Sequence, residues 1–277
     1  MDRPGLSLAI DTALVERLLV QFLREEIHSA GFTRAVLGVS GGIDSAVVAA
    51  LAARALGANN VLGVLLPYRE STPQSEIDGI LLCDTLGIRR DKVDISAMAD
   101  GYISLAPKMD RLRRGNVLAR CRMIVLYDRA ASDKALVMGT SNKTELLLGY
   151  TTQFGDSASA LNPIGDLYKN QVYQLARHLK MPEALVTKAP SADLFAGQTD
   201  ESELGFTYEA VDRLLYLMVD ERYSEDDLLR AGFELAFVRK IVARIASTQF
   251  KRVPPIIAKL SQRTVNQDFR YLRDWGR

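Results

Sequence analysis

Hydrophobic residues in the first half of the chain follow two patterns, helical spacing and short continuous runs. Apolar side chains recur every three or four positions between residues 14 and 27, which predicts an amphipathic helix. Continuous apolar runs follow at residues 35–39, 61–66 and 135–138, and a serine, a proline or a glycine ends each of them. Runs of this length are typical of strands that are buried on both faces of a parallel sheet.

Helical segments separate these runs. A helix is predicted at residues 46–53, a second from Thr72-Pro73 to Gly87, and a third at residues 116–131. We expect five side chains of the third helix to face inward: Val117, Cys121, Ile124, Val125 and Tyr127. A short strand is predicted at residues 92–95. The alternation predicts a doubly wound, Rossmann-like parallel sheet, which binds ligands at the carboxyl ends of its strands.

The pattern changes after about residue 185. Helical periodicity dominates from residue 207 to residue 250, and Pro254-Pro255 then interrupts it. We therefore expect a single domain of residues 1–277, made of an α/β nucleotide-binding core at 1–185 and a helical C-terminal part at 186–277.

Composition and charge narrow the class of protein. An apolar fraction of 48% supports a sizeable core, and 35 Lys and Arg residues against 34 Asp and Glu residues do not indicate a nucleic-acid-binding surface. The two cysteines, Cys83 and Cys121, are expected to be inert packing thiols. No signal peptide and no membrane-length apolar stretch occurs, so we expect a cytoplasmic protein without a membrane partner.

The stretch Ser-Gly-Gly-Ile-Asp-Ser at residues 40–45 lies between the first predicted strand and its helix. Glycines let the backbone approach an anion, and the N–H groups and dipole of a helix N-terminus favour negative charge. We expect six residues to hold the phosphates of ATP: Ser40, Gly41, Gly42, Ile43, Asp44 and Ser45. Asp44 also offers a hard oxygen ligand for Mg²⁺. The alternative is a structural turn in which Asp44 caps the helix.

A second loop at residues 139–145 has the same position between a strand and a helix. Glu145 either caps its own helix together with Asn142 or reaches toward Mg²⁺ opposite Asp44. Neighbouring strands would bring both loops to one crevice.

The first loop lacks the Walker pattern and instead resembles the pyrophosphate loop of enzymes that split ATP into AMP and pyrophosphate. A loop that binds the pyrophosphate part of ATP leaves the α-phosphorus as the electrophile, so the expected intermediate is an adenylate. Five further segments, together with this loop, resemble the NAD⁺ synthetase family over roughly residues 10–255: residues 115–122, 149–156, 162–169, 190–194 and 197–205.

The resemblance implies roles for individual residues. Asp44 and Glu145 would bind Mg²⁺, Asp44 and Lys169 would be catalytic, and Thr140, Lys169 and Ser191 would complete the ATP site. Arg120 would contact deamido-NAD, the dinucleotide substrate. At Gln153, Ala160 and Phe250-Lys251 the better-known bacterial members carry lysine, aspartate and His-Lys, and these positions would also contact the dinucleotide.

The implied reaction amidates deamido-NAD to NAD⁺ with ammonia and releases AMP and pyrophosphate from ATP. We expect ammonia to be used directly or delivered by a separate subunit, because only about one helix precedes the first strand. A homodimer and a lid at residues 199–205 are further expectations. The alternatives are a related enzyme that acts on another carboxylate or on tRNA, and a nucleotide-binding module without catalysis.

Overall fold

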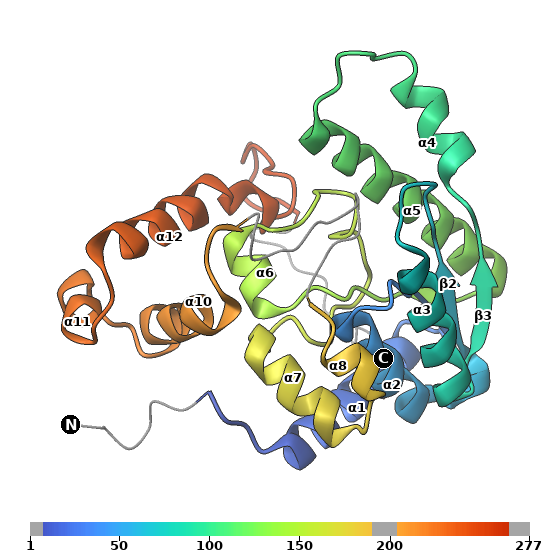
Figure 1. Cartoon of the computed structure of the whole chain (residues 1–277), viewed down its shortest axis with the longest axis horizontal. Coiled ribbons are helices and arrows are strands. Elements are labelled where there is room, and N and C mark those ends of the chain that lie inside the picture. Colours follow the sequence, from blue (N-terminus) through green and yellow to red (C-terminus); the bar gives the residue numbers. More distant parts are fainter. Residues whose placement is uncertain (1–7, 190–203, 266–277) are drawn as a thin grey trace.

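The computed structural model describes residues 8–189 and 204–265. Its centre is a parallel sheet with the strand order β3-β2-β1-β4. Figure 1 labels β2 and β3 of this sheet. The strands are β1 (Ala35–Gly38), β2 (Val61–Leu65), β3 (Arg89–Lys92) and β4 (Leu136–Val137). The predicted parallel sheet is therefore confirmed.

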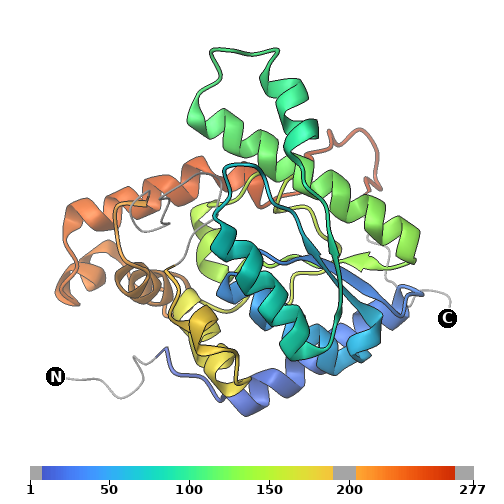
Figure 2. The ribbon, with the colours of Figure 1, turned by 45° about the vertical axis from the view of Figure 1, so that its right-hand side comes forward.

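Helices cover both faces of this sheet. One face carries α1 (Thr12–Ser29), α2 (Ile43–Leu56), α3 (Pro73–Leu86), α7 (Lys169–His178) and α8 (Glu183–Val186). The other face carries α4 (Ser96–Ile103) and α5 (Arg111–Asp133). In Figure 2 the green helix α5 lies above the strands and the blue helix α1 lies below them.

Strand β1 contributes to both layers of the core. Ala35 and Leu37 pack with α2, whereas Val36 packs with α5 on the opposite face. Successive side chains of a strand point to opposite faces, so a strand covered on both sides must be apolar throughout. This requirement explains the continuous apolar run.

A third cluster of buried side chains joins the C-terminal helices. They are α10 (Tyr208–Leu215), a π-helical segment (Tyr216–Asp220), α11 (Glu225–Arg230), α12 (Leu235–Ser247) and the 3₁₀ turn η3 (Gln249–Lys251). Their core also takes in Leu148 of α6 (Lys143–Leu148) and Tyr168. The prediction of helix between residues 207 and 250 is confirmed. The remaining 3₁₀ turn, η1 (Ala58–Asn60), leads into β2.

The strand order reverses beside β1. The chain moves outward from β1 to β2 and β3, and then returns to place β4 on the other side of β1. In open α/β sheets ligands bind at such a switch point, outside the carboxyl ends of the strands. Residues 40–45 follow β1 and residues 139–145 follow β4, so the topology brings the two predicted loops together.

Two details of the prediction were wrong. Strand β3 covers Arg89–Lys92 rather than residues 92–95. It lies at the edge of the sheet and its side chains are charged, so no apolar run marks its position in the sequence. Ile124 and Tyr127 face outward, with 52% and 43% of their surface exposed. The buried residues of α5 include Leu118, Cys121 and Val125.

Both cysteines are buried and free, as predicted. Burial raises the pKa of the Cys83 thiol to about 11, so this thiol stays protonated at neutral pH. Among residues 8–189 and 204–265, no helix combines the length and hydropathy that crossing a bilayer requires.

Gly63 tests the packing of β2 against α3. A Cβ at this position would lie 2.9 Å from Sγ of Cys83 and 2.9 Å from Cγ2 of Val39. We expect Gly63→Ala to lower the free energy of unfolding by about 1–3 kcal/mol, because overpacking displaces core side chains. The matched control is Gly101→Ala in α4, where no atom lies within 4 Å of the added carbon. Denaturant unfolding of both variants provides the measurement, and equal stability of both would contradict the packing argument.

Candidate active site

A cavity of about 1300 Å³ opens at the carboxyl ends of β1, β2 and β4. Its wall includes Gly38 and Val39 after β1, Leu66 after β2, and Met138 and Gly139 after β4. The cavity therefore occupies the switch point of the sheet, and its volume exceeds the roughly 300–1,000 Å³ that is usual for a pocket holding one drug-sized ligand.

The first loop depends on Gly41. Its φ is +70°, and an added Cβ would lie 2.6 Å from the carbonyl oxygen of Ser75 and 2.8 Å from Cβ of Asp78 in α3. Only glycine permits this backbone conformation together with this close approach. Lys188 supports the loop from the same side, because its Nζ lies 2.8 Å from Oδ2 of Asp78 and 3.4 Å from the carbonyl oxygen of Gly41.

The helix that follows this loop has a terminus suited to an anion. Gly42 is the N-cap of α2, and among the described residues no side chain caps it. Ser45 Oγ donates to the carbonyl oxygen of Gly42 at 2.9 Å, and this hydrogen bond stabilises the turn. The N-terminal amides and dipole of α2 therefore favour a phosphate in the cavity. The alternative in which Asp44 caps this helix is not observed.

Asp44 instead joins the two loops. Asn142 Nδ2 donates to its Oδ1 at 2.9 Å, and Lys169 Nζ lies 2.5 Å from its Oδ2. The same Nζ lies 3.5 Å from Oε1 of Glu145. Asp44 thus meets Glu145 and Lys169, two predicted site residues that lie more than a hundred positions later in the chain.

Glu145 caps its own helix, which is one of the two roles that the sequence left open. Its Oε2 accepts from the backbone N–H of Asn142 at 3.2 Å, which completes a capping box at the start of α6. Its Oε1 faces Lys169 and the cavity. The cap fixes the direction in which the remaining carboxylate oxygen points.

Lys169 is unusual because it is almost completely buried, with 2% of its surface exposed. A buried ammonium group requires carboxylate partners, which Asp44 and Glu145 supply. Its Nζ also lies 5.0 Å from the ring centre of Tyr208. These contacts hold a positive charge at the inner end of the cavity.

Asp44 and Glu145 also have the chemistry of a magnesium site. Mg²⁺ is commonly bound by one or two carboxylates together with the phosphates of a substrate. Within the described part of the chain no group of three or more acidic, histidine or cysteine side chains forms a metal site. The donor set therefore fits an ion that arrives with a nucleotide.

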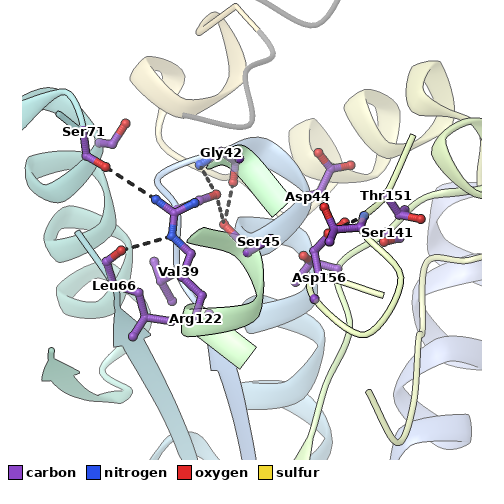
Figure 3. A pocket seen from close by; sticks show the side chains of 18 of the residues that line it. Val39, Gly42, Asp44, Ser45, Leu66, Ser71, Arg122, Ser141, Thr151 and Asp156 are labelled. Carbon is purple, nitrogen blue, oxygen red and sulfur yellow. Dashed lines mark hydrogen bonds between the residues drawn. The ribbon is translucent and has the colours of Figure 1, made fainter. Parts of the chain in front are cut away.

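The opposite wall contains residues that the sequence analysis did not single out. Arg122 donates from Nε to the carbonyl oxygen of Leu66 at 3.1 Å and reaches Ser71 Oγ at 3.4 Å, as Figure 3 shows. Asp156 accepts from the backbone N–H of Thr152 at 2.7 Å. Asp156 faces the open cavity, yet the surrounding protein raises the pKa of its carboxyl group by desolvation.

The predicted site residues divide into two sets. Most of them line the cavity: Ser40, Gly42, Ile43, Asp44, Ser45, Thr140, Glu145, Lys169 and Lys251. Among the described residues of the cavity wall, five predicted ones are absent: Gly41, Arg120, Gln153, Ala160 and Phe250. Ser191 and most of the predicted lid at residues 199–205 lie outside the described residues.

Two predicted substrate residues nevertheless lie together. Arg120 donates from Nε and Nη2 to the carbonyl oxygen of Gln153 at 3.3 and 3.2 Å. Phe250 is 55% exposed, whereas Lys251 turns inward and donates to the carbonyl oxygens of Gly149 and Thr151 at 2.8 and 2.7 Å. Desolvation lowers the pKa of the Lys251 ammonium group.

Arg122 and Lys188 could be found in the sequence only by position. Arg122 belongs to the motif at residues 115–122, and Lys188 precedes the motif at residues 190–194. No periodicity distinguishes either residue from a surface cation, since their roles depend on contacts with other elements.

Gly41 provides a direct test of the first loop. We expect Gly41→Ala to weaken ATP binding by about ten-fold or more, because the added carbon displaces the loop from α3. Gly31→Ala is the matched control, since Gly31 also has a positive φ, +84°, but no atom lies within 4 Å of the added carbon. Calorimetric titration with ATP measures both variants. Equal ATP affinities of the two variants would contradict the prediction, because they would show that the close approach at Gly41 does not govern ATP binding.

Comparisons with known proteins agree with this geometry. The model of the family described as NAD synthase matches residues 15–255. The NH(3)-dependent NAD(+) synthetase of Chlorobaculum parvum is 54% identical over 97% of both chains, and that of Chlorobium phaeovibrioides is 56% identical over 97% of both chains.

Solved structures agree as well. An NH3-dependent NAD synthetase from Campylobacter jejuni has a TM-score of 0.78 and 33% identity, covering 91% of this chain and all of that chain (100%). An NMN synthetase from Francisella tularensis has a TM-score of 0.79 and 30% identity, covering 90% of this chain and 99% of that chain. The resemblance drawn from the motifs is confirmed, and the chain belongs to the NAD synthase family.

Proposed function

We propose that this chain amidates deamido-NAD to NAD⁺ with ammonia and uses ATP to activate the acid. The observation that carries the proposal is the meeting of Asp44, Glu145 and Lys169 at the switch point, in a member of the NAD synthase family. The relatives at 54–56% identity that are NH(3)-dependent NAD(+) synthetases support the same substrates.

The reaction has two steps. A carboxylate oxygen of deamido-NAD attacks the α-phosphorus of ATP, and the bond from this phosphorus to the pyrophosphate oxygen breaks. Ammonia then attacks the carbonyl carbon of the acyl-adenylate. AMP leaves with the oxygen that joined it to the acyl group, and the nitrogen loses a proton to give the amide.

The first step brings an anionic nucleophile to an anionic phosphate. Lys169 would offset this repulsion, because its buried ammonium group stands at the inner end of the cavity. The loop at residues 40–45 and Thr140 would hold the phosphates, and Ser191 would complete the ATP site. None of these roles requires a covalent protein nucleophile.

Asp44 and Glu145 would hold Mg²⁺ together with the ATP phosphates. When bound, the ion would neutralise part of the phosphate charge and make the α-phosphorus more electrophilic. Lys169 contacts both carboxylates, so its Nζ would share them with the ion.

A homodimer would give Arg120 and Gln153 a place in the site. Arg120, Ile124 and Tyr127 follow one another at helical spacing on the exposed side of α5. A second copy that covers this stripe would bury Ile124 and Tyr127 and place Arg120 at the edge of a shared pocket. Arg120, Gln153, Ala160 and Phe250 would then contact the dinucleotide although they lie outside the cavity of one chain.

The likeness to an NMN synthetase supports a second candidate substrate. The acid form of NMN carries the same carboxyl group on a smaller nucleotide, and the same two steps would convert it. The dinucleotide remains the first candidate, because the relatives of higher identity are NAD(+) synthetases.

Pyrophosphate release tests the proposed reaction. We expect release from ATP and Mg²⁺ to require deamido-NAD, and NAD⁺ to form only when ammonia is added. Chelation of divalent cations should abolish release, because without the cation the carboxylates of Asp44 and Glu145 would repel the phosphates. Turnover with the mononucleotide acid and not with deamido-NAD would favour the second candidate. Release that depends on neither would contradict the proposed function.

Light scattering tests the dimer. We expect the wild-type chain to be a dimer at micromolar concentration and Ile124→Asp to be a monomer, because a charge on a buried apolar contact is costly. Ile77→Asp on α3 is the matched control, since Ile77 is 56% exposed and lies on the other face of the sheet. A wild-type monomer would refute this part of the proposal.

A further inference from the structure

Asp212 is a completely buried carboxyl group behind the cavity. It lies on α10 in the core of the C-terminal helices, has 0% of its surface exposed, and is absent from the described cavity wall. The mechanism above gives it no function. An acidic side chain is rarely placed in a core unless it is paired or hydrogen-bonded.

The contacts of Asp212 connect the first turns of two helices. Thr144 Oγ1 in α6 donates to its Oδ1 at 2.5 Å. Asn170 in α7 donates from both its backbone N–H and its Nδ2 to Oδ2, each at 2.8 Å. One carboxylate from the C-terminal part therefore accepts from two of the helices that line the active site.

Each of these helices carries a proposed site residue in its first turn. Lys169 begins α7, and its backbone N–H donates to Thr144 Oγ1 at 3.0 Å. Glu145 follows Thr144 directly in α6. Tyr208, one turn before Asp212 on α10, places its ring 5.0 Å from Lys169 Nζ. The same face of α10 thus contacts Lys169 through Tyr208 and its helix through Asp212.

The three donors require a group that only accepts. An ionised carboxylate satisfies all of them, whereas an amide would present its own N–H groups to one of them. Desolvation raises the pKa of Asp212 to about 6, so ionisation of this group opposes folding above its ordinary pKa. A charge retained at a cost in stability is more easily explained by function than by packing.

We propose that Asp212 is a positioning residue: it fixes the first turns of α6 and α7 and so holds Glu145 and Lys169 against Asp44. The proposal rests on the proposed function, because it assigns Asp212 an effect on the step that Lys169 assists. Asp212 acts through Thr144 and Asn170 and does not contact the substrates.

The test is Asp212→Asn, measured by pyrophosphate release. We expect kcat to fall by about 10- to 100-fold, because a misplaced ammonium group loses transition-state stabilisation. The melting temperature should stay close to that of the wild type, since removal of a buried charge offsets the lost hydrogen bond. Asp227→Asn is the matched control: Asp227 caps exposed α11 in the same helical part, and kcat should not change.

A double-mutant cycle with Lys169→Gln separates positioning from a general structural effect. If Asp212 positions Lys169 as well as Glu145, Asp212→Asn should lower kcat by a clearly smaller factor in the Lys169→Gln background than in the wild type. Losses that multiply would overturn the proposal, and so would wild-type kcat in Asp212→Asn.

Two variants at Thr144 decide the case in which Asp212→Asn does not fold. Thr144→Ser keeps the hydroxyl group and should retain kcat, whereas Thr144→Val removes it and should reproduce the loss. Equal activity of both would overturn the proposal. If the wild-type chain binds ATP but shows no turnover with deamido-NAD, the proposed function fails, and the same cycle measured on ATP affinity still decides the role of Asp212.

Discussion

The contact between Lys169 and Asp44 is the interaction on which the rest of the site depends. A buried ammonium group is stable only beside carboxylates, and the two partners come from opposite ends of the α/β core. For this contact to form, β4 must lie beside β1, α6 must start with a capped Glu145, and α7 must begin at Lys169. The ion pair between Lys169 and Asp44 can therefore form only with the observed strand order, in which β4 lies beside β1.

The parts of the fold that could be predicted are those in which burial determines residue type. Strands β1 and β2 are covered on both faces, so their apolar runs mark them directly. Strand β3 could not be placed in the same way, because an edge strand with charged side chains pairs through backbone groups that have no sequence signature. The wrong prediction for Ile124 and Tyr127 shows that an apolar residue on a helix need not face the core of its own chain.

The candidate site could be predicted where a loop has local chemistry. Residues 40–45 combine glycines, hydroxyls and an acid between a strand and a helix, and Glu145 lies at a recognisable helix start. Asp212 has no such local signal, because the role proposed for it depends on its contacts with Thr144 and Asn170, which are far away in the chain. The family resemblance identified Lys169, but only the structure shows that it is buried.

Helix α6 has only six residues, a length at which an isolated helix does not persist in water. Asp212 holds its first turn, and Arg244, Lys251 and Arg252 donate to the carbonyl oxygens at its other end. The C-terminal helices therefore stabilise α6, the helix that carries Glu145. If recombination replaced the sequence after about residue 185, the sheet would be preserved, but α6 would lose the helices that stabilise it. The two halves of the sequence must consequently be inherited together, although only the first half contains the two loops that are predicted to bind the nucleotide.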